Sequence, residues 1–547
     1  MKFIADPFIA ALSKDPSASN TPRTVPHGFY SEVQPKKVSK PQLLHANPKL
    51  LKVLGISQKD IQDPKIVELL SGQALPGQLK PYAMNYGGHQ FGHWAGQLGD
   101  GRAIHLGSLQ EIDEAVQSAE QAPGKIWQLQ LKGAGPTPYS RTADGLAVLR
   151  SSIREYLCSE AMYALGVPST RALSLVLTGD QVLRDVLYNG NPAYEPGAIV
   201  ARMAPNFIRF GSFELPATRG QKEALKELAD ACITHHFPHI KQKGTKAYVA
   251  FFEEVCQRTA ALVIDWQRVG FVHGVLNTDN MSILGLTIDY GPYGWLEPYD
   301  PDWTPNTTDA AQRRYRFGNQ SQVGLWNLYQ LANALYPIIG ETAPLEAALE
   351  TYKNDYEWGY QEMMAKKIGL SQLQKKGSQQ KREAIAQLIE SLEETLCLTE
   401  TDMTIFFRTL SQWEPIHTPK ANKKADASYI FGPVYAAFYS PEELKGSLLE
   451  SWKNWLTSYK DLLHIQDQNI SERSIQMNAV NPKYVLRNYM AQLAIEKAEK
   501  GDYSLVSTLF ELLQKPYDEQ PTKEEWFTKR PEWAKNKVGS SQLSCSS

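Results

Sequence analysis

One short stretch limits the folding options of this chain more than any other segment. It runs from His273 to Asn280, His-Gly-Val-Leu-Asn-Thr-Asp-Asn, and Asp289-Tyr290-Gly291 follows nine residues after Asn280. Residues 281–288 are mostly apolar or β-branched and include a glycine, which predicts a short buried hairpin between the two polar groups. Such a hairpin would hold the oxygen atoms of Asp279, Asn280 and Asp289 in fixed positions. Because Mg²⁺ prefers one or two protein oxygen ligands together with phosphate oxygens, the stretch predicts a magnesium and phosphate site.

The spacing of this stretch is similar to that of two protein-kinase loops, H-R-D-x-x-x-x-N and D-F-G. In kinases the Asp two residues after the His accepts the proton of the substrate hydroxyl, but that position is Val275 here. Valine cannot accept a proton, so either the chain is catalytically inactive or the base has moved, and Asp279 is the nearest candidate. The alternative interpretation is a surface turn, because Asn, Thr and Asp are common turn residues.

A glycine-rich segment upstream is a second candidate for phosphate binding. Residues 86–102 contain six glycines, end in Gly99-Asp100-Gly101-Arg102 and precede a predicted strand at 103–107. Glycines let backbone N–H groups approach a ligand closely, although such loops are often only tight turns. His89 and His93 have the spacing of metal ligands on a helix, but the surrounding glycines argue against a helix there.

A lysine and a glutamate lie on the next two predicted elements. Lys132 ends an alternating strand at 126–132, and Glu155 lies on a predicted helix at 146–165. In kinases, a strand lysine and a helix glutamate form the ion pair that orients the phosphates. The alternative for Glu155 is a solvated helix face on which it pairs with Arg154.

Two arginines follow in settings that require an anionic partner. We predict strands at 170–177 and 197–203; Arg202 lies in the second, and Arg209 lies in the aromatic turn 204–211. An unpaired buried charge is costly, so each guanidinium needs either a protein carboxylate or phosphate oxygens. Their position after a Gly-rich loop and a strand lysine favours phosphate.

The order of the elements predicts an α+β fold with two lobes, as in protein kinases. We expect an N-terminal extension (1–80) packed on a β-rich N-lobe (81–215), a helical C-lobe (216–450), additional C-terminal helices (451–515) and a polar, loosely held tail (516–547). A net charge of −2 argues against a nucleic-acid-binding face. No apolar run approaches the roughly 18 residues of a membrane span, and the N-terminus is a poor signal peptide. We therefore expect a cytoplasmic protein, and a monomer.

The five cysteines are too scattered for a disulfide framework or a zinc cluster. We expect Cys158, Cys232, Cys256 and Cys397 to be buried as small apolar side chains. Cys545 differs because it lies in the polar tail, where we expect an exposed thiol.

Taken together, the motifs resemble those of the selenoprotein O family along nearly the whole chain. The resemblance rests on Gly99 to Arg102, Leu131 to Gly135, Leu149 to Glu155, His273 to Asn280, Asp289 to Gly291 and the Cys-Ser-Ser ending, in which Cys545 matches the position of selenocysteine in some relatives. The resemblance implies a pseudokinase fold and the transfer of AMP from ATP to Ser, Thr or Tyr hydroxyls of proteins, with release of pyrophosphate. It also implies that ATP binds in a flipped orientation, and a link to redox homeostasis, for which Cys545 offers a thiol open to redox control although its role is not encoded in the sequence.

The resemblance also implies roles for individual residues. Asp279 would be the proton acceptor, and Asn280 and Asp289 would ligate Mg²⁺ or Mn²⁺. Glu155 would position Lys132, and Arg202 and Arg209 would bind the γ-phosphate. The implied nucleotide contacts are Gly99, Gly101, Arg102, Lys132, Asp144, Gly145, Arg202, Arg209 and Asp289.

Two alternatives to AMP transfer remain at this point. An ordinary phosphotransferase would move the γ-phosphate of ATP to its product, although Val275 leaves it without the kinase base. A non-catalytic ATP-binding scaffold would be stabilised by nucleotide but would label no substrate.

Overall fold

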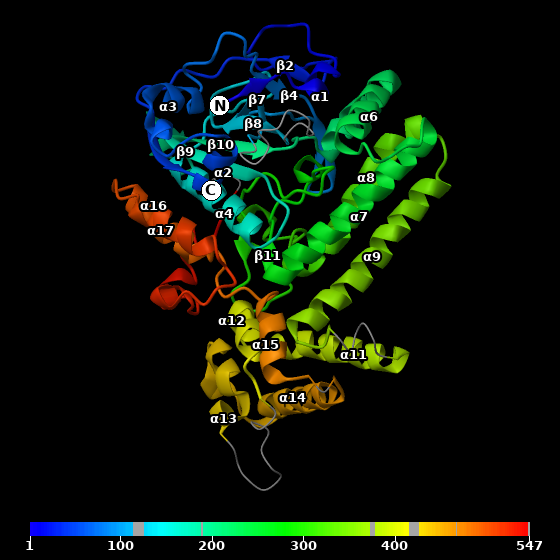
Figure 1. Cartoon of the computed structure of the whole chain (residues 1–547), viewed down its shortest axis with the longest axis vertical. Helices are drawn as coiled ribbons and strands as arrows, with labels where there is room; N and C mark the ends of the chain where they lie inside the picture. Colours follow the sequence, from blue (N-terminus) through cyan, green and yellow to red (C-terminus); the bar gives the residue numbers. More distant parts are fainter. Residues whose placement is uncertain (113–124, 187–189, 372–377, 415–425, 467, 545–547) are drawn as a thin grey trace.

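The computed structural model describes residues 1–544 with the exception of 113–124, 187–189, 372–377, 415–425 and 467. Strands and the N-terminus lie at one end of the molecule, long helices occupy the middle, and a smaller group of helices lies at the other end (Figure 1). The chain is therefore a mixed α/β protein with a β-rich N-terminal part and a helical C-terminal part. No helix in the described part of the chain is both long and apolar enough to cross a membrane.

An antiparallel eight-stranded sheet forms the N-terminal part of the described chain. Its order is β2-β4-β7-β8-β10-β9-β3, and β1 pairs with β7. The strands are β1 (Phe3–Ile4), β2 (Tyr30–Glu32), β3 (Gln42–Ala46), β4 (Tyr82–Met84), β7 (Ala103–Gln110), β8 (Ile126–Lys132), β9 (Arg171–Arg184) and β10 (Ala193–Ala204). A separate hairpin pairs β5 (Gly87–Gln90) with β6 (His93–Gln97). The first 80 residues thus supply three strands to the main sheet.

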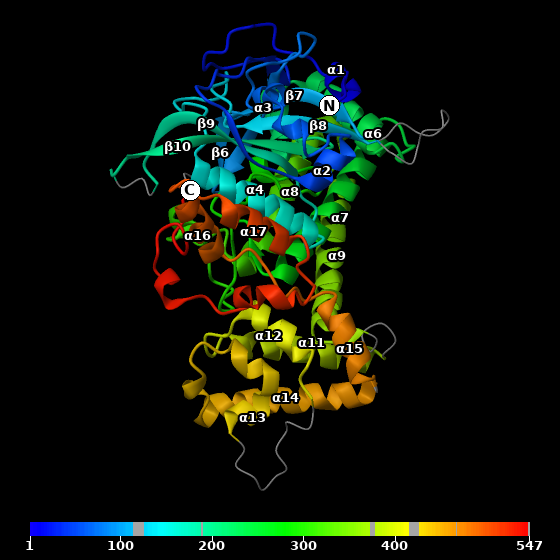
Figure 2. The same cartoon turned by 60° about the vertical axis from the view of Figure 1, so that its left-hand side comes forward.

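Helices and loops cover both faces of the sheet. Because side chains along a strand alternate between its two sides, neighbouring residues of β10 pack in different cores. Ile199 on β10 packs in one core with Leu70 of α3 (Pro64–Leu70), near α2 (Pro48–Val53). Its neighbour Val200 packs in another core with Ile153 of α4 (Leu149–Ala164). Figure 2 shows α4 below the sheet, and the C-terminal helices α16 (Asn488–Ala498) and α17 (Ser504–Leu513) pack against it.

The middle of the molecule is helical and delivers the loop that contains the 273–291 motif. Its helices are α5 (Phe210–Thr218), α6 (Lys222–His236), α7 (Thr245–Val269), α8 (Gln320–Ile339) and α9 (Ala343–Lys367), and a short α1 (Pro7–Ala10) contacts α6. Gly270 ends α7 in the left-handed conformation (φ 73°), which only glycine adopts without cost. The chain then enters β11 (Phe271–Val272), which pairs with β12 (Gly294–Trp295). The loop between these two short strands carries the whole motif.

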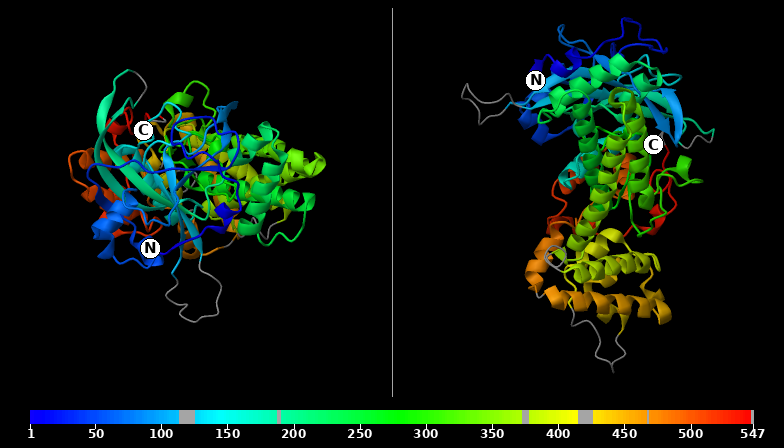
Figure 3. Two further views of the ribbon diagram at one scale, coloured as in Figure 1. Left: turned by 90° about the horizontal axis from the view of Figure 1, so that it is seen from above. Right: turned by 90° about the vertical axis from the view of Figure 1, so that its right-hand side faces the viewer.

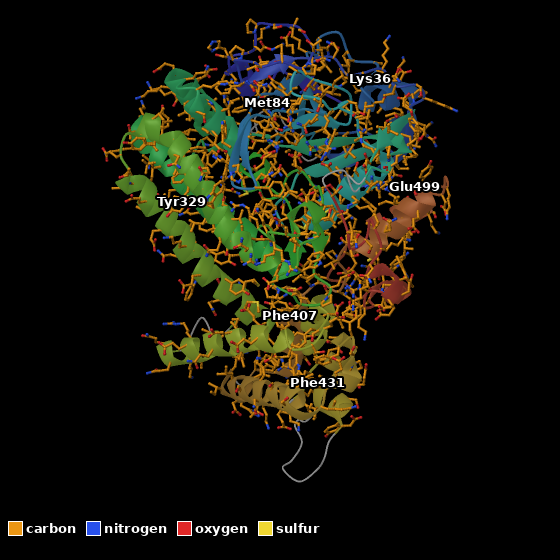
Figure 4. The ribbon with its side chains drawn as sticks, turned by 180° about the vertical axis from the view of Figure 1, so that it is seen from behind. Lys36, Met84, Tyr329, Phe407, Phe431 and Glu499 are labelled. Atoms are coloured by element: carbon orange, nitrogen blue, oxygen red, sulfur yellow. The ribbon has the colours of Figure 1, made fainter. Side chains whose placement is uncertain are left out.

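The helices at the far end have their own hydrophobic core. They are α11 (Gln379–Leu396), α12 (Met403–Leu410), α13 (Ala427–Phe431), α14 (Gly446–Gln466) and α15 (Ile470–Asn478). Phe407 and Phe431 belong to this core, whereas Met84 of the sheet belongs to the central one (Figure 4). The right-hand view of Figure 3 shows this group beyond the ends of the long helices, on the side away from the sheet.

Three expectations about secondary structure need correction. The hairpin expected at 281–288 is reduced to one bridge between Met281 and Thr287, because Ser282 pairs with Arg209 and Thr287 pairs with Ser169. The strands expected at 170–177 and 197–203 extend into a long β9–β10 hairpin. The helix expected from 146 begins at Leu149, since Leu146 forms a bridge to Ala134 and Val148 forms a bridge to Gly197 of β10.

The C-terminal segment and one cysteine also differ from expectation. We expected the tail to be loosely held, but its described part is packed: Ala534, Ser540 and Leu543 are buried. The backbone of Leu543 pairs with the 305–307 loop, where its carbonyl accepts a hydrogen bond from the Thr307 N–H at 2.8 Å. Cys397 is exposed rather than buried, in contrast to Cys158, Cys232 and Cys256. Cys545 lies outside the described residues.

Candidate active site

A cleft of about 710 Å³ lies between the glycine-rich segment, the loop before α4 and the 273–291 motif. Most of the residues predicted from sequence line it: Gly99, Gly101, Arg102, Lys132, Asp144, Gly145, Arg202, Asp279, Asn280 and Asp289. The other two predicted residues, Glu155 and Arg209, are buried and contact residues of the cleft lining. The structure therefore brings residues far apart in the sequence to one site.

His273 is buried outside the lining of the cleft and anchors the motif. Its Nε2 lies 3.0 Å from the carbonyl oxygen of Ile288, and its backbone N–H donates to the Gln320 side chain at 3.0 Å. Burial lowers the pKa of His273, so the neutral ring donates its Nε2 proton to that carbonyl. This bond fixes the 273–280 loop against Asp289, which directly follows Ile288 and lies in the left-handed region at φ 58°. Strained backbone of this kind, which costs on the order of 1 kcal/mol, is concentrated at functional sites.

Glu155 is the centre of a buried ion network. Its carboxylate lies 2.5 Å from Lys132 Nζ and 2.7 Å from Arg202 Nη1. Burial alone would raise the pKa of Glu155, but the charges of Lys132 and Arg202 hold it below its usual value. The alternative of a solvated helix face is wrong, because the Arg154 side chain turns away and donates to the carbonyl of Tyr293 at 2.8 Å.

Asp289 lies between the two predicted arginines. Arg202 Nη1 is 2.7 Å from its Oδ1, and Arg209 Nη1 donates to its Oδ2. Arg209 also donates to the backbone oxygen of Asp279 at 2.7 Å. In this structure both arginines therefore have a protein carboxylate as partner, and their contact with phosphate stays a prediction.

The charges of this network perturb both Asp289 and Lys132. Burial opposes ionisation of Asp289, but Arg209, Arg202 and Lys132 hold its pKa well below the usual range. Burial lowers the pKa of Lys132 to about 8, and Glu155 opposes that shift. A cluster of cations that ionised carboxylates hold in place is suited to a site for anionic oxygens.

Asp279 has the properties of a proton acceptor that works near neutral pH. Burial raises the pKa of its carboxyl to about 7, although the nearby Arg209 opposes the shift. Its Oδ2 accepts a hydrogen bond from the Gln90 side chain at 3.2 Å. Its buried Oδ1 has no hydrogen-bond partner among the described residues. A base whose pKa lies near the working pH combines the correct protonation state with useful proton affinity.

Asn280 and Asp289 supply a donor set that fits a hard divalent cation. The Asn280 side chain donates from Nδ2 to the carbonyl of Val275 at 2.8 Å, which leaves its Oδ1 as the atom for a ligand. The carboxylate of Asp289 is ionised, and each of its oxygens has a lone pair beyond the one facing an arginine. One amide oxygen and one carboxylate, completed by phosphate oxygens, match the preference of Mg²⁺.

The glycines of the cleft have packing roles that sequence reasoning did not foresee. Gly99 has φ 81°, and a Cβ there would lie 2.4 Å from the ring of Tyr139. Gly145 has φ 71°, and a Cβ there would lie 2.3 Å from the backbone of Gly135. The neighbouring Asp144 is bound by Arg184, with both guanidinium contacts at 2.8 Å.

Sequence reasoning missed several residues of the site. One of them is Asp100, which is buried. Its Oδ1 lies 3.9 Å from Arg209, and its Oδ2 accepts a hydrogen bond from the backbone N–H of Met84 at 3.0 Å. Its position between Gly99 and Gly101 was the available signal. Gln90 and Arg184 also line the cleft, and no local pattern marks either residue.

The two histidines considered as metal ligands do not form such a site. His89 bonds through Nδ1 to Glu214, and His93 lies across the hairpin from Gln90. In the part of the chain that the structure describes, no three His, Cys, Asp or Glu side chains are grouped as metal ligands.

Comparison with known proteins identifies similar sequences along the whole chain. The model of a family described as protein adenylyltransferase SelO matches residues 17–514. A protein of Flavobacterium johnsoniae named protein nucleotidyltransferase YdiU is 54% identical over 541 residues, covering 99% of this chain and 98% of the relative. Proteins of the same name from Rhodopirellula baltica and Aromatoleum aromaticum are 50% and 49% identical, each again covering 99% of this chain and 98% of the relative.

Proposed function

We propose that this chain, which belongs to the protein adenylyltransferase SelO family, transfers AMP from ATP to the hydroxyl groups of Ser, Thr or Tyr residues in other proteins and releases pyrophosphate. The observation that carries the proposal is that one cleft collects the nucleotide, metal and base residues expected from the sequence. Family membership supports the nucleotidyl chemistry, and the side chains of the cleft support its mechanism.

The fold supports a kinase-like arrangement of this site. We infer that the sheet with α4 forms an N-lobe and that the helices α5 to α9 form a C-lobe, with the cleft between them. The buried Lys132–Glu155 pair on β8 and α4 supports this inference, because the same pair orients phosphates in kinases. The far helices and α16 and α17 are then additions to the two lobes.

Phosphate binding falls to the cations of the cleft. Lys132, Arg102 and Arg202 line the cleft, and the buried Arg209 is paired with Asp289. In our proposal, the phosphate oxygens of ATP bind the two guanidinium groups that Asp289 binds in the free protein. Preorganised cations of this kind stabilise the charge that develops on the leaving pyrophosphate.

The remaining steps use Asp279, Asn280 and Asp289. Asp279 accepts the proton of the incoming hydroxyl. The oxygen of that hydroxyl then attacks the α-phosphorus, and the bond between the α-phosphorus and the pyrophosphate breaks. Asn280 and Asp289 would hold Mg²⁺ or Mn²⁺, which neutralises phosphate charge when bound. Orientation of the hydroxyl in line with the α-phosphorus supplies much of the rate.

Labelled ATP tests the proposal against its alternatives. The purified protein is incubated with candidate proteins and either α-labelled or γ-labelled ATP, and AMP adducts are located by mass spectrometry. We expect protein-bound label from the α-position only. Label from the γ-position would show a phosphotransferase instead. Nucleotide-dependent thermal stabilisation without any label on protein would show an ATP-binding scaffold.

A further inference from the structure

The tip of the β5–β6 hairpin contacts the loop that contains Asp279 through three successive residues. The backbone N–H of His89 donates to Thr278 Oγ1 at 2.7 Å. The side chain of Gln90 donates to Asp279 Oδ2 at 3.2 Å. The backbone N–H of Phe91 donates to the Tyr315 hydroxyl at 2.8 Å, and that hydroxyl donates to Asn277 Oδ1 at 2.5 Å. Nearly 190 residues of sequence separate the two segments that these bonds join.

The hairpin turn is strained in a way that these contacts explain. Phe91 and Gly92 form its two-residue turn, with φ 51° and φ 85°. Positive φ at both turn positions suits the twist of a hairpin, but a bulky residue adopts it only at a cost on the order of 1 kcal/mol. The ring of Phe91 packs on Tyr315 at a centroid distance of 5.3 Å, and its N–H is bonded to that same residue. The contact with the loop thus offsets the strain.

The position of the hairpin also depends on its neighbours. Its two strands pair only with each other among the described strands, and a two-stranded hairpin is marginally stable alone. Its first strand, β5, contacts both α5 and the 278–280 turn. Gly88 allows the close approach, since a Cβ there would lie 2.9 Å from the Asp279 Cβ. The hairpin and the loop therefore hold each other.

From these contacts we propose that the tip of the β5–β6 hairpin, residues His89 to Phe91, holds the 277–280 loop in its working conformation, with Gln90 as the positioning residue of the Asp279 carboxylate. The proposal deepens the assignment of AMP transfer to this cleft and rests on it. Gln90 binds one carboxylate oxygen and thereby fixes the rotation of the group. The other oxygen keeps its lone pairs for the proton of the substrate hydroxyl.

The first test compares Gln90→Met with His93→Ala in the full-length protein. Methionine keeps the approximate length of glutamine but has no amide to donate. His93 lies opposite Gln90 in the same hairpin, is exposed and does not line the cleft, so its variant controls for damage to the hairpin. Steady-state AMP transfer gives kcat and KM for ATP, and direct titration gives the ATP affinity.

We expect Gln90→Met to lower kcat by about 10- to 100-fold, since misplacing a catalytic group by about 1 Å has effects of that size. The KM and the affinity for ATP should stay within about twofold, because Gln90 contacts the base and not the cations of the cleft. His93→Ala should behave as wild type. A Gln90→Met protein with unchanged kcat, or with kcat and ATP affinity reduced together, would overturn the proposal.

A second measurement tests the contact without using activity. Thermal unfolding is recorded for the wild type, Gln90→Met, Asp279→Ala and the double variant. We expect Gln90→Met to lower Tm when Asp279 is present and to have no further effect in Asp279→Ala. Additive effects would refute the contact. A wild-type protein that transfers no AMP would refute the proposed function, while this cycle would still decide whether Gln90 holds Asp279.

Discussion

At the level of single residues, the carboxylate of Asp289 makes contacts that its sequence position does not suggest. It binds Arg202 and Arg209, two arginines that the sequence assigns to phosphate, and it follows the residue that His273 holds. The same side chain thus pairs with both arginines in the free protein and supplies a metal ligand in our proposal. Nucleotide binding must then redistribute these contacts.

Replacement of Asp289 by alanine should therefore affect both activity and stability. We expect AMP transfer to be abolished, because a metal ligand is lost. We also expect a loss of about 3 kcal/mol in the free energy of unfolding, because two buried guanidinium groups lose their shared partner. Denaturant titration and the α-label assay measure the two effects. Near-wild-type transfer would overturn the metal assignment, and unchanged stability would show that the arginines find other partners.

Asp279 should behave differently from Asp289. In our proposal it is the base and not a nucleotide ligand, so Asp279→Ala should still bind ATP. Its kcat should fall by about 10²- to 10⁴-fold, the usual contribution of general base catalysis. Nucleotide-dependent thermal stabilisation reports binding, and the label assay reports turnover. If the variant no longer binds ATP, Asp279 is a ligand of the nucleotide or its metal.

At the level of elements, the sequence predicted what depends on local patterns. The alternation along 126–132 predicts β8, and the order strand lysine then helix glutamate predicts the buried Lys132–Glu155 pair. The 281–288 hairpin could not be predicted in its true form, because only Met281 and Thr287 pair with each other, while Ser282 also pairs with Arg209 and Thr287 also pairs with Ser169. Gln90 was missed for the same reason, since its partner lies nearly 190 residues away.

The glycine-rich segment has a packing role in addition to the phosphate-binding role that its sequence predicts. Sequence reasoning ascribed its glycines to the close approach of phosphate. In the structure, Gly99 makes room for the ring of Tyr139, which hydrogen-bonds to Ser31 of β2 at 2.8 Å, and the contact of Gly99 with phosphate stays a prediction. The turn is thereby packed against the N-terminal strands before any ligand binds.

We expect Gly99→Ala to weaken ATP binding through this contact. The new methyl group would displace Tyr139, and the left-handed backbone would add strain of about 1–2 kcal/mol. ATP affinity should fall by roughly tenfold, as about 1.4 kcal/mol of distortion would produce. Titration of ATP into Gly99→Ala, Tyr139→Ala and the double variant measures the coupling. Packing predicts a smaller effect of Gly99→Ala when the ring is absent, whereas equal effects would favour direct phosphate contact.

At the level of the whole molecule, the C-terminal segment joins parts that lie far apart in the sequence. Leu543 bonds to the 305–307 loop, and Asn306 in that loop donates to the carbonyl of Gly274 in the motif at 3.0 Å. The next residue, Ser544, donates to the carbonyl of Val186 in the β9–β10 hairpin. This segment therefore links the sheet to the loop that carries the site, which its polar composition did not indicate.

A largely buried carboxyl makes another such link, and this link depends on pH. Glu297 follows β12 and lies 3.4 Å from Arg530 of the C-terminal segment. Arg487 and Asp402, which form a buried ion pair at 2.8 Å, are its other charged neighbours. Burial raises the pKa of Glu297 to about 7, against the opposing charges of Arg487 and Arg530.

The sign of the pH effect follows from this shift. The carboxyl ionises at pH ~4.3 in the unfolded chain and at pH ~7 in the folded protein. Between these two values the folded protein binds more protons than the unfolded chain does. The stabilisation from neutral Glu297 is therefore complete below the lower value and is lost as the pH rises through the upper one. The loss is on the order of 3 kcal/mol. We expect Glu297→Gln, which stays neutral, to gain stability relative to wild type between pH 5 and pH 8. Denaturant titrations of both proteins at pH 5 and pH 8 measure the difference in their free energies of unfolding. If that difference is the same at both pH values, Glu297 ionises without cost in the folded protein.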